Sequence, residues 1–136
     1  MSHIPESHHD LLDQPIAVTL GTTMPDNTPQ TTVLWFKWDG ENILMSTTKG
    51  RQKFENLQNN PKVSAMMIDP DNMYRYLEVR GTITFRDEGA FELIDELAKM
   101  YTGKDKYYGN LAPAEARQKE ERVVLVLTPE RVITVG

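Results

Sequence analysis

The segment TTKGRQKFENLQNNPKVSAMM, residues 47–67, carries the clearest structural signal in this sequence. Phe54 and Leu57 would share one face of a short helix, which Pro61 stops because proline has no backbone N–H and clashes with the preceding turn. The residues before Lys49 and the stretch Lys62–Ile68 after the proline are typical of strands. The segment therefore predicts a strand, a short helix and a second strand in close succession.

Cationic residues gather at the expected start of this helix. The first backbone N–H groups of a helix have no partner within it and carry partial positive charge, so they attract anions. Positive side chains at this end of a helix are repelled by that charge and destabilise the helix by about 0.3 kcal/mol or more each, unless an anion is bound. This sequence places three of them there, Lys49, Arg51 and Lys53. Gly50 would let a ligand approach the backbone closely. Hydroxyl groups precede it at Ser46, Thr47 and Thr48. A polar helix start without a ligand would show the same spacing, but the sign of the charges favours an anion site.

Hairpin-forming strands dominate the rest of the chain. Turn residues and β-branched runs predict strands at Ile16–Thr23, Gln30–Trp38, Asn42–Thr47, Tyr74–Phe85, Val123–Leu127 and Arg131–Val135. Gly81 predicts a bulge within its strand, and Thr128-Pro129-Glu130 predicts a turn between the last two strands. Sequential hairpins favour an antiparallel sheet that closes into a barrel over a doubly wound α/β fold.

Helical periodicity is strongest over residues 88–101. Apolar side chains recur there at helical spacing, at Phe91, Ile94, Leu97, Ala98 and Tyr101. We expect this helix to plug one end of the barrel, and we expect shorter helices over residues 7–12 and 113–119. The prediction is a mainly β fold: an antiparallel barrel of six to seven strands with one long and two or three short helices. It forms a single domain over residues 1–136, in which residues 1–6 are expected to be flexible.

Composition excludes several classes of function. The net charge of −5 argues against general binding to nucleic acid or to an anionic membrane surface. The absence of cysteine excludes disulfides and thiolate metal sites. His3, His8 and His9 lie in a polar terminal segment, where a frayed terminus is favoured over a metal site. No apolar run approaches the roughly 20 residues of a membrane span, and we expect a cytoplasmic protein without a metal.

The segment quoted first resembles the phosphate-binding part of the pyridoxamine 5′-phosphate oxidase-like split barrels, which bind FMN or the deazaflavin coenzyme F420. In that family a lysine eight residues before the proline of an Asn-Pro pair binds the coenzyme phosphate, and Lys53 has this position relative to Pro61. The stretch PQTTVLWFKWDGENILMST, residues 29–47, is similar to the family strands that run along the isoalloxazine ring. The resemblance covers nearly the whole chain and implies a split barrel. With the pattern at the helix start, it implies coenzyme contacts for Thr31, Thr32, Val33, Leu34, Trp35, Ser46, Thr47, Gly50, Arg51 and Lys53.

The resemblance also implies a homodimer whose subunits share the coenzyme sites. Arg75 and Tyr76 would then be contributed by the second chain, with ordinary cross-strand packing as the alternative for both. The basic, glycine-flanked loop Thr102–Gly109 would move over a bound ligand. Its Lys104 and Lys106 would meet the acidic oligoglutamate tail of F420, and a solvated loop is the alternative.

Two shorter matches refine the expected function. IDPDNMYRYLEVRG, residues 68–81, and YTGKDKYY, residues 101–108, resemble a subgroup of short split barrels described as F420-dependent enzymes. The chain lacks the C-terminal Trp and Arg motif of pyridoxamine phosphate oxidases, and Gln52 stands where those enzymes have a second cation. We therefore expect an F420-dependent oxidoreductase that transfers hydride between the reduced deazaflavin and a conjugated organic acceptor, such as a quinone, an enone or a tetrapyrrole. The alternatives are an FMN-binding oxidase or reductase of the same fold, and a non-catalytic flavin-binding or stress-related module. No catalytic side chain is assigned, because the hydride chemistry belongs to the coenzyme.

Overall fold

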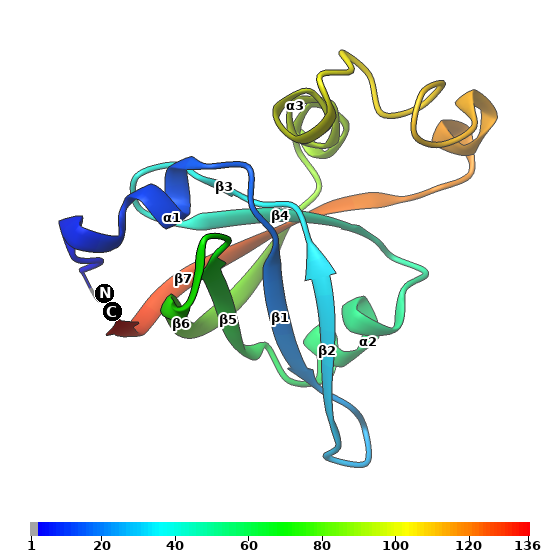
Figure 1. The fold of residues 1–136 in the computed structure, drawn as a ribbon. Coiled ribbons are helices and arrows are strands. Elements are labelled where there is room, and N and C mark those ends of the chain that lie inside the picture. Colours follow the sequence, from blue (N-terminus) through cyan, green and yellow to red (C-terminus); the bar gives the residue numbers. More distant parts are fainter. Residues whose placement is uncertain (1–2) are drawn as a thin grey trace.

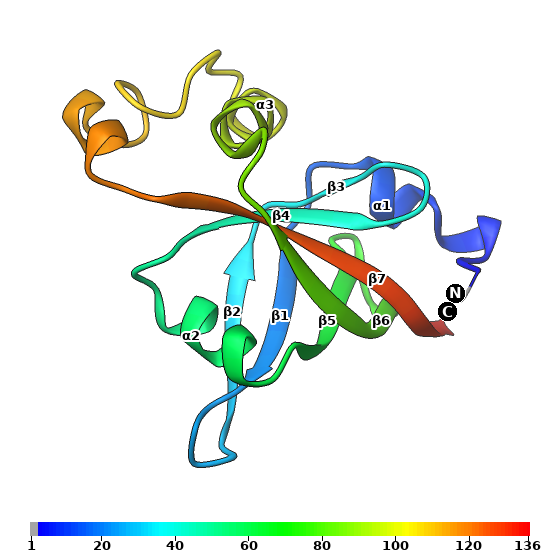
Figure 2. The same ribbon diagram turned by 180° about the vertical axis from the view of Figure 1, so that it is seen from behind.

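Buried and more exposed residues alternate along strands such as Val18–Thr23 and Lys62–Asp69, which belong to one curled antiparallel sheet in the computed structural model; the model describes residues 3–136 (Figures 1 and 2). The strands are β1 (Val18–Thr23), β2 (Pro29–Leu34), β3 (Lys37–Trp38), β4 (Ile43–Thr48), β5 (Lys62–Asp69), β6 (Asn72–Arg86) and β7 (Arg122–Val135). Their order across the sheet is β2-β1-β5-β6-β7-β4-β3, and every neighbouring pair is antiparallel. The predicted mainly β fold is confirmed.

The link between β2 and β3 shows how the sheet closes. These strands lie at opposite edges of the sheet, yet only Trp35 and Phe36 separate them in the sequence. So short a link can join the two edges only if the sheet curls round until they approach each other. The predicted barrel is therefore confirmed. The single strand predicted over Gln30–Trp38 is wrong, because the chain leaves one edge after Leu34 and joins the other at Lys37.

The longest strand pair, β6 and β7, contains the predicted bulge. The pairing register shifts between Arg80 and Gly81, and Gly81 lies opposite Pro129. A Cβ atom on residue 81 would stand 2.0 Å from the carbonyl oxygen of Thr128, so the close approach of the two strands requires glycine. The turn predicted at Thr128–Glu130 is wrong, since β7 continues through it. Proline is tolerated inside this strand because a bulge removes the need for a ladder N–H.

Two helices cover different faces of the curled sheet. α2 (Gln52–Asn59) contributes Phe54 and Leu57 to the core inside the barrel. α3 (Ala90–Thr102) instead packs Leu97 on the outer face of the sheet, against Leu44 of β4 and Val124 of β7 (Figure 1). The prediction that this long helix plugs a barrel end is wrong. Successive strand residues point to opposite faces, and Leu44 and Val124 alternate with residues of the barrel core, so both faces of β4 and β7 are apolar and need cover.

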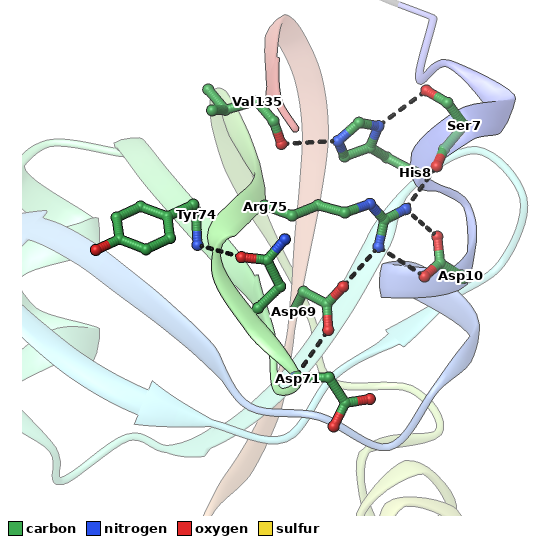
Figure 3. A network of polar contacts seen from close by, with 9 residues as sticks. Ser7, His8, Asp10, Asp69, Asp71, Tyr74, Arg75 and Val135 are labelled. Atoms are coloured by element: carbon green, nitrogen blue, oxygen red, sulfur yellow. Dashed lines mark hydrogen bonds and ion pairs between the residues drawn. The ribbon is translucent and has the colours of Figure 1, made fainter.

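The N-terminal segment packs against the barrel through η1 (Glu6–His8) and α1 (Asp10–Asp13). Ile4 and His8 are buried, and the Nε2 atom of His8 lies 3.1 Å from the carbonyl oxygen of Val135, to which it donates (Figure 3). The expected flexibility of residues 1–6 is therefore wrong for Ile4, and so is the frayed setting expected for His8. Met1 and Ser2 lie outside the described residues. A last short helix, η2 (Ala114–Gln118), lies between α3 and β7. No helix within residues 3–136 is long and apolar enough to cross a membrane.

Candidate functional site

A cavity of about 340 Å³ lies where the ends of β2 and β4 approach the start of α2 and one face of α3. Seven of the residues predicted from the sequence line it, namely Val33, Leu34, Trp35, Ser46, Thr47, Arg51 and Lys53. The other lining residues are Ala17, Thr48, Ile94, Leu97, Tyr101, Tyr107 and Arg122. The cavity has a cationic end at α2 and an apolar, aromatic wall formed by Trp35 and α3.

Lys53 is a buried cation in the wall of this cavity. Its residue is only 8% exposed, and within residues 3–136 no acceptor lies within hydrogen-bonding distance of its ammonium group. Burial, followed by the nearby charge of Arg51, lowers the pKa of Lys53. The helix begins at Gln52 with an extended Arg51 before it and without a side-chain cap. An unpaired ammonium, unpaired helix N–H groups and the hydroxyl of Thr47 together fit a phosphate group.

Asn56 fixes the position of α2 beneath the cavity. This side chain is fully buried, and its Nδ2 atom donates to Thr22 Oγ1 of β1 at 3.1 Å and to Gln30 Oε1 of β2 at 3.0 Å. Its Oδ1 atom accepts a hydrogen bond from Gln52 at 2.9 Å. Since Asn56 lies one helical turn after Lys53, these bonds also orient the lysine toward the cavity.

The aromatic wall is held in place by Tyr101. Its ring stacks on Trp35 with centroids 5.3 Å apart and an angle of 18° between the planes. Its hydroxyl accepts from the N–H of Phe36 at 3.1 Å and lies 2.8 Å from the carbonyl oxygen of Ile16, to which it can donate. Burial raises the pKa of Tyr101, so the hydroxyl stays protonated and keeps its donor. The indole of Trp35 therefore presents a fixed surface to a planar ligand.

Replacing Tyr101 by phenylalanine is expected to lower the free energy of unfolding by about 1–3 kcal/mol, because the N–H of Phe36 and the carbonyl of Ile16 lose their partner. Tyr74→Phe is the matched control, since that side chain is 73% exposed, and a change within about 0.5 kcal/mol is expected. Urea unfolding monitored by circular dichroism measures both. Equal small effects of the two substitutions would show that the hydroxyl of Tyr101 does not fix the wall.

Arg122 is a second cation in the cavity wall that the sequence did not single out. Its Nε atom donates to the hydroxyl of Tyr108 at 2.7 Å, and its Nη1 atom donates to Ser46 Oγ at 2.9 Å. The guanidinium carbon lies 4.8 Å from the centroid of the Tyr107 ring, and the side chain is 7% exposed. Its place in the site follows from the pairing of Thr48 with Arg122 across β4 and β7. No sequence pattern indicated that pairing.

The remaining predicted residues lie outside the cavity. Thr31 and Thr32 belong to β2 but do not line it, and Gly50 borders a separate hollow near Lys119. Lys49 is also directed elsewhere, forming an ion pair with Asp87 at 3.0 Å. The predicted tail-binding lysines, Lys104 and Lys106, are exposed and do not line the cavity.

Arg75 and Tyr76 lie on β6, away from the cavity. Figure 3 shows the guanidinium of Arg75 between Asp10 and Asp69, where it also donates to the carbonyl oxygen of Ser7 at 2.6 Å. The hydrogen bond from Arg75 is the main cause of the lowered pKa of Asp10. In this chain Arg75 therefore ties the N-terminal segment to the β5–β6 hairpin. A contribution of these two residues to a second subunit's site stays a prediction.

The buried ammonium of Lys53 leads to a pH-dependent prediction. Because its pKa in the folded protein is lowered, the charge destabilises the fold at neutral pH. As the pH rises through that lowered pKa toward the ordinary value for lysine, the unfolded chain binds more protons than the folded one, and this destabilisation is lost. Lys53→Met is expected to raise the free energy of unfolding of the coenzyme-free protein by about 1 kcal/mol at pH 7 and by less at pH 10. Urea unfolding at both pH values measures the difference, with Lys119→Met, an exposed lysine, as control. A difference that grows with pH would contradict the argument.

Comparisons with known proteins agree with this architecture. No curated protein sequence matches the chain. The sequence model of the pyridoxamine 5′-phosphate oxidase family matches residues 4–136. A solved structure named F420 reductase is 37% identical, with a TM-score of 0.81, and the match covers 96% of this chain and 98% of that chain.

Two more distant structures share the fold alone. HutZ, a heme storage protein from Vibrio cholerae, is 17% identical with a TM-score of 0.71, over 99% of this chain and 96% of that chain. General Stress Protein 26 from Bacillus anthracis is 14% identical with a TM-score of 0.68, over 96% and 92% of the two chains. The family match spans nearly the whole sequence, including the segment that builds β4, α2 and β5, and the chain therefore belongs to the pyridoxamine 5′-phosphate oxidase family.

Proposed function

We propose that this chain is an F420-dependent oxidoreductase that transfers hydride between the reduced deazaflavin and a conjugated organic acceptor. The observation that carries the proposal is Lys53, a buried ammonium without an acceptor among residues 3–136, beside an uncapped helix start. Such a group destabilises the protein unless an anion binds it, and a coenzyme phosphate is the anion that this family supplies.

The residues of the cavity fit the parts of the coenzyme. Lys53, Arg51 and the first N–H groups of α2 would bind the phosphate, with Thr47 as a further donor. The end of β2, at Val33 to Trp35, would support the ring. When bound, the reduced deazaflavin would supply two electrons as hydride, and the acceptor would take up one further proton. The apolar side chains of the α3 wall would keep water from the ring.

Support for F420 over FMN comes from the relative at 37% identity that is named F420 reductase. Gln52 also favours F420 over FMN, because a neutral residue at this position leaves fewer cations around the phosphate than the pyridoxamine phosphate oxidases have. FMN is the second candidate, since the matching family is named for pyridoxamine 5′-phosphate oxidase. A quinone, an enone or a tetrapyrrole-like molecule would serve as acceptor.

Parallel fluorescence titrations of the purified protein with F420 and with FMN test the proposal. We expect F420 to bind at micromolar concentration or below, more tightly than FMN, and the loaded protein to oxidise reduced F420 when a conjugated acceptor is added. Tighter binding of FMN would favour the second candidate. Tight binding without turnover on any acceptor would favour a non-catalytic flavin-binding module, and binding of neither coenzyme would reject the redox function.

We further propose that the active form is a homodimer with shared sites. Val33 lines the cavity and is nevertheless 69% exposed, so this wall is open to solvent in a single chain. Further exposed apolar side chains lie at Ile68, Met73 and Tyr74. A second copy would cover this surface and bring Arg75 and Tyr76 to the coenzyme of its neighbour. Light scattering during gel filtration tests this, and a monomer that binds the coenzyme at full affinity would reject it.

A further inference from the structure

The guanidinium of Arg122 is held rigidly at the cavity wall by contacts on several sides. Tyr108 and Ser46 accept hydrogen bonds from Nε and Nη1. The guanidinium carbon also lies 4.8 Å from the ring centroid of Tyr107 and 5.6 Å from that of Tyr108. These contacts come from β4 and from the loop after α3, so the orientation of the planar group does not depend on a ligand.

Arg122 keeps donors that no protein group uses. A guanidinium has five N–H donors, and two of them are engaged, by Tyr108 and Ser46. Glu120 is its nearest carboxylate, at 3.9 Å from Nη2, which is too far for a hydrogen bond. Within residues 3–136 the remaining donors therefore have no acceptor.

A structural role explains the charge at this position only in part, because cation–π contacts with Tyr107 and Tyr108 offset some of the cost of its burial. The two accepting hydroxyls could be satisfied by a neutral donor, whereas burying a cation is costly when no carboxylate bonds it directly. Lys53 is likewise a little-exposed cation that no carboxylate bonds among residues 3–136. It belongs to α2, however, whereas Arg122 belongs to β7.

The neighbouring wall indicates what kind of ligand Arg122 meets. Tyr107 stands edge-on to Trp35, with ring centroids 6.2 Å apart, and Trp35 stacks on Tyr101. A planar group lying against these rings would bring its substituents near the free N–H donors of Arg122. Guanidinium groups with a fixed orientation bind carboxylates through paired hydrogen bonds.

We propose that Arg122 binds a carboxylate of the ligand in this cavity, at a site distinct from the phosphate site of Lys53. The inference rests on the proposed function, because it assigns a ligand chemistry to a second part of the same cavity. The carboxylate belongs to a planar electron acceptor or to the glutamate tail of the coenzyme, and its binding chemistry at Arg122 is the same in both cases. The reaction leaves this carboxylate unchanged.

The test measures the binding of matched probes by calorimetry. The first pair is 2-naphthoate and its neutral amide, which differ in the carboxylate alone. The second pair is F420 with its tail and a fragment that keeps the phosphate but lacks the glutamates. The variants are Arg122→Gln and Arg122→Lys. Arg117→Gln is the control, since Arg117 also lies over an aromatic ring, that of Phe91 at 4.3 Å, but outside the cavity.

In one of the two pairs, Arg122→Gln is expected to weaken the binding of the probe that carries the carboxylate about tenfold or more. The binding of the matching neutral or tail-free probe is expected to weaken less than about threefold. Arg122→Lys should lose less, because it keeps the charge, and Arg117→Gln should change neither. Selective loss of naphthoate assigns the site to the acceptor, and selective loss of the tailed coenzyme assigns it to the tail.

The proposal would be overturned if Arg122→Gln weakened the binding of both members of each pair equally. It would also be overturned if Lys53→Ala weakened the binding of naphthoate and Arg122→Gln did not. If Arg122→Gln does not fold, the binding of the probes to Arg122→Lys and to Tyr108→Phe tests the proposal instead. The latter removes the acceptor of Nε and keeps both rings, and it should cost the same probe a few-fold in affinity. The naphthoate pair contains no coenzyme, so it is read independently of whether wild-type protein binds F420 or FMN.

Discussion

Alanine in place of Lys53 is expected to weaken the binding of F420 by about ten- to hundredfold, the usual worth of a hydrogen bond to a charged group. The large effect follows from burial, since the Lys53 residue is only 8% exposed and little water competes with the phosphate for its ammonium group. The same substitution should leave the fold intact or stabilise it, because it removes a buried charge that has no acceptor within residues 3–136. Affinity and stability are thus expected to change in opposite directions.

Lys119→Ala is the matched control for this experiment. It removes the same charge from an exposed residue outside the cavity. Fluorescence titration and urea unfolding of both variants give the two quantities. A loss of affinity shared by Lys53→Ala and Lys119→Ala would show that net charge, rather than the buried ammonium, governs binding. Parallel losses of affinity and stability in Lys53→Ala would indicate that the lysine only supports the fold.

Alanine in place of Gly81 is expected to lower the free energy of unfolding by about 3 kcal/mol or more, enough to unfold a marginally stable domain. The added Cβ would stand 2.0 Å from the carbonyl oxygen of Thr128 and 2.9 Å from Leu127 Cδ1. The first of these atoms is backbone, so β6 and β7 would have to separate at the bulge. Because this pair lies at the centre of the sheet order, the distortion would spread to both halves of the barrel.

Gly21→Ala provides the comparison for Gly81→Ala. Gly21 is also inside a strand, β1, but its added Cβ would lie 3.5 Å from the nearest atom, the carbonyl oxygen of Ser64, which is an ordinary contact. We expect a change within about 1 kcal/mol. Thermal and urea unfolding of the two variants measure the contrast. Similar small effects at both positions would mean that the strands separate easily at the bulge, contrary to the packing described above.

Local signals in the sequence predicted most of the elements correctly. The short helix before Pro61, the bulge at Gly81 and the antiparallel barrel are all present. The errors arose where tertiary structure overrides local pattern. A β-rich run over Gln30–Trp38 reads as one strand, and only closure of the barrel requires the chain to change edge at Trp35. Likewise Pro129 signals a turn, and only the bulge opposite it allows the strand to continue.

The candidate site was predictable where one segment supplies it. Thr47, Arg51 and Lys53 are neighbours in sequence, and the positive charges of Arg51 and Lys53 at the positive end of a helix dipole indicated an anion site in advance. Arg122 and Tyr107 come from far along the chain, and they reach the cavity through strand pairing and the packing of α3, which periodicity does not reveal. Gly50 and Lys49 were predicted from proximity in sequence, but the helix start directs them to another surface.

We propose that Lys53 and the start of α2 hold the phosphate of the coenzyme. FMN and riboflavin differ in the phosphate alone, so the ratio of their dissociation constants isolates its contribution. We expect wild-type protein to bind FMN at least about tenfold more tightly than riboflavin. In Lys53→Ala we expect a clearly smaller ratio, because only Arg51, Thr47 and the N–H groups of α2 would remain for the phosphate. A ratio that is the same in both proteins would show that the phosphate is held elsewhere, and would contradict the account.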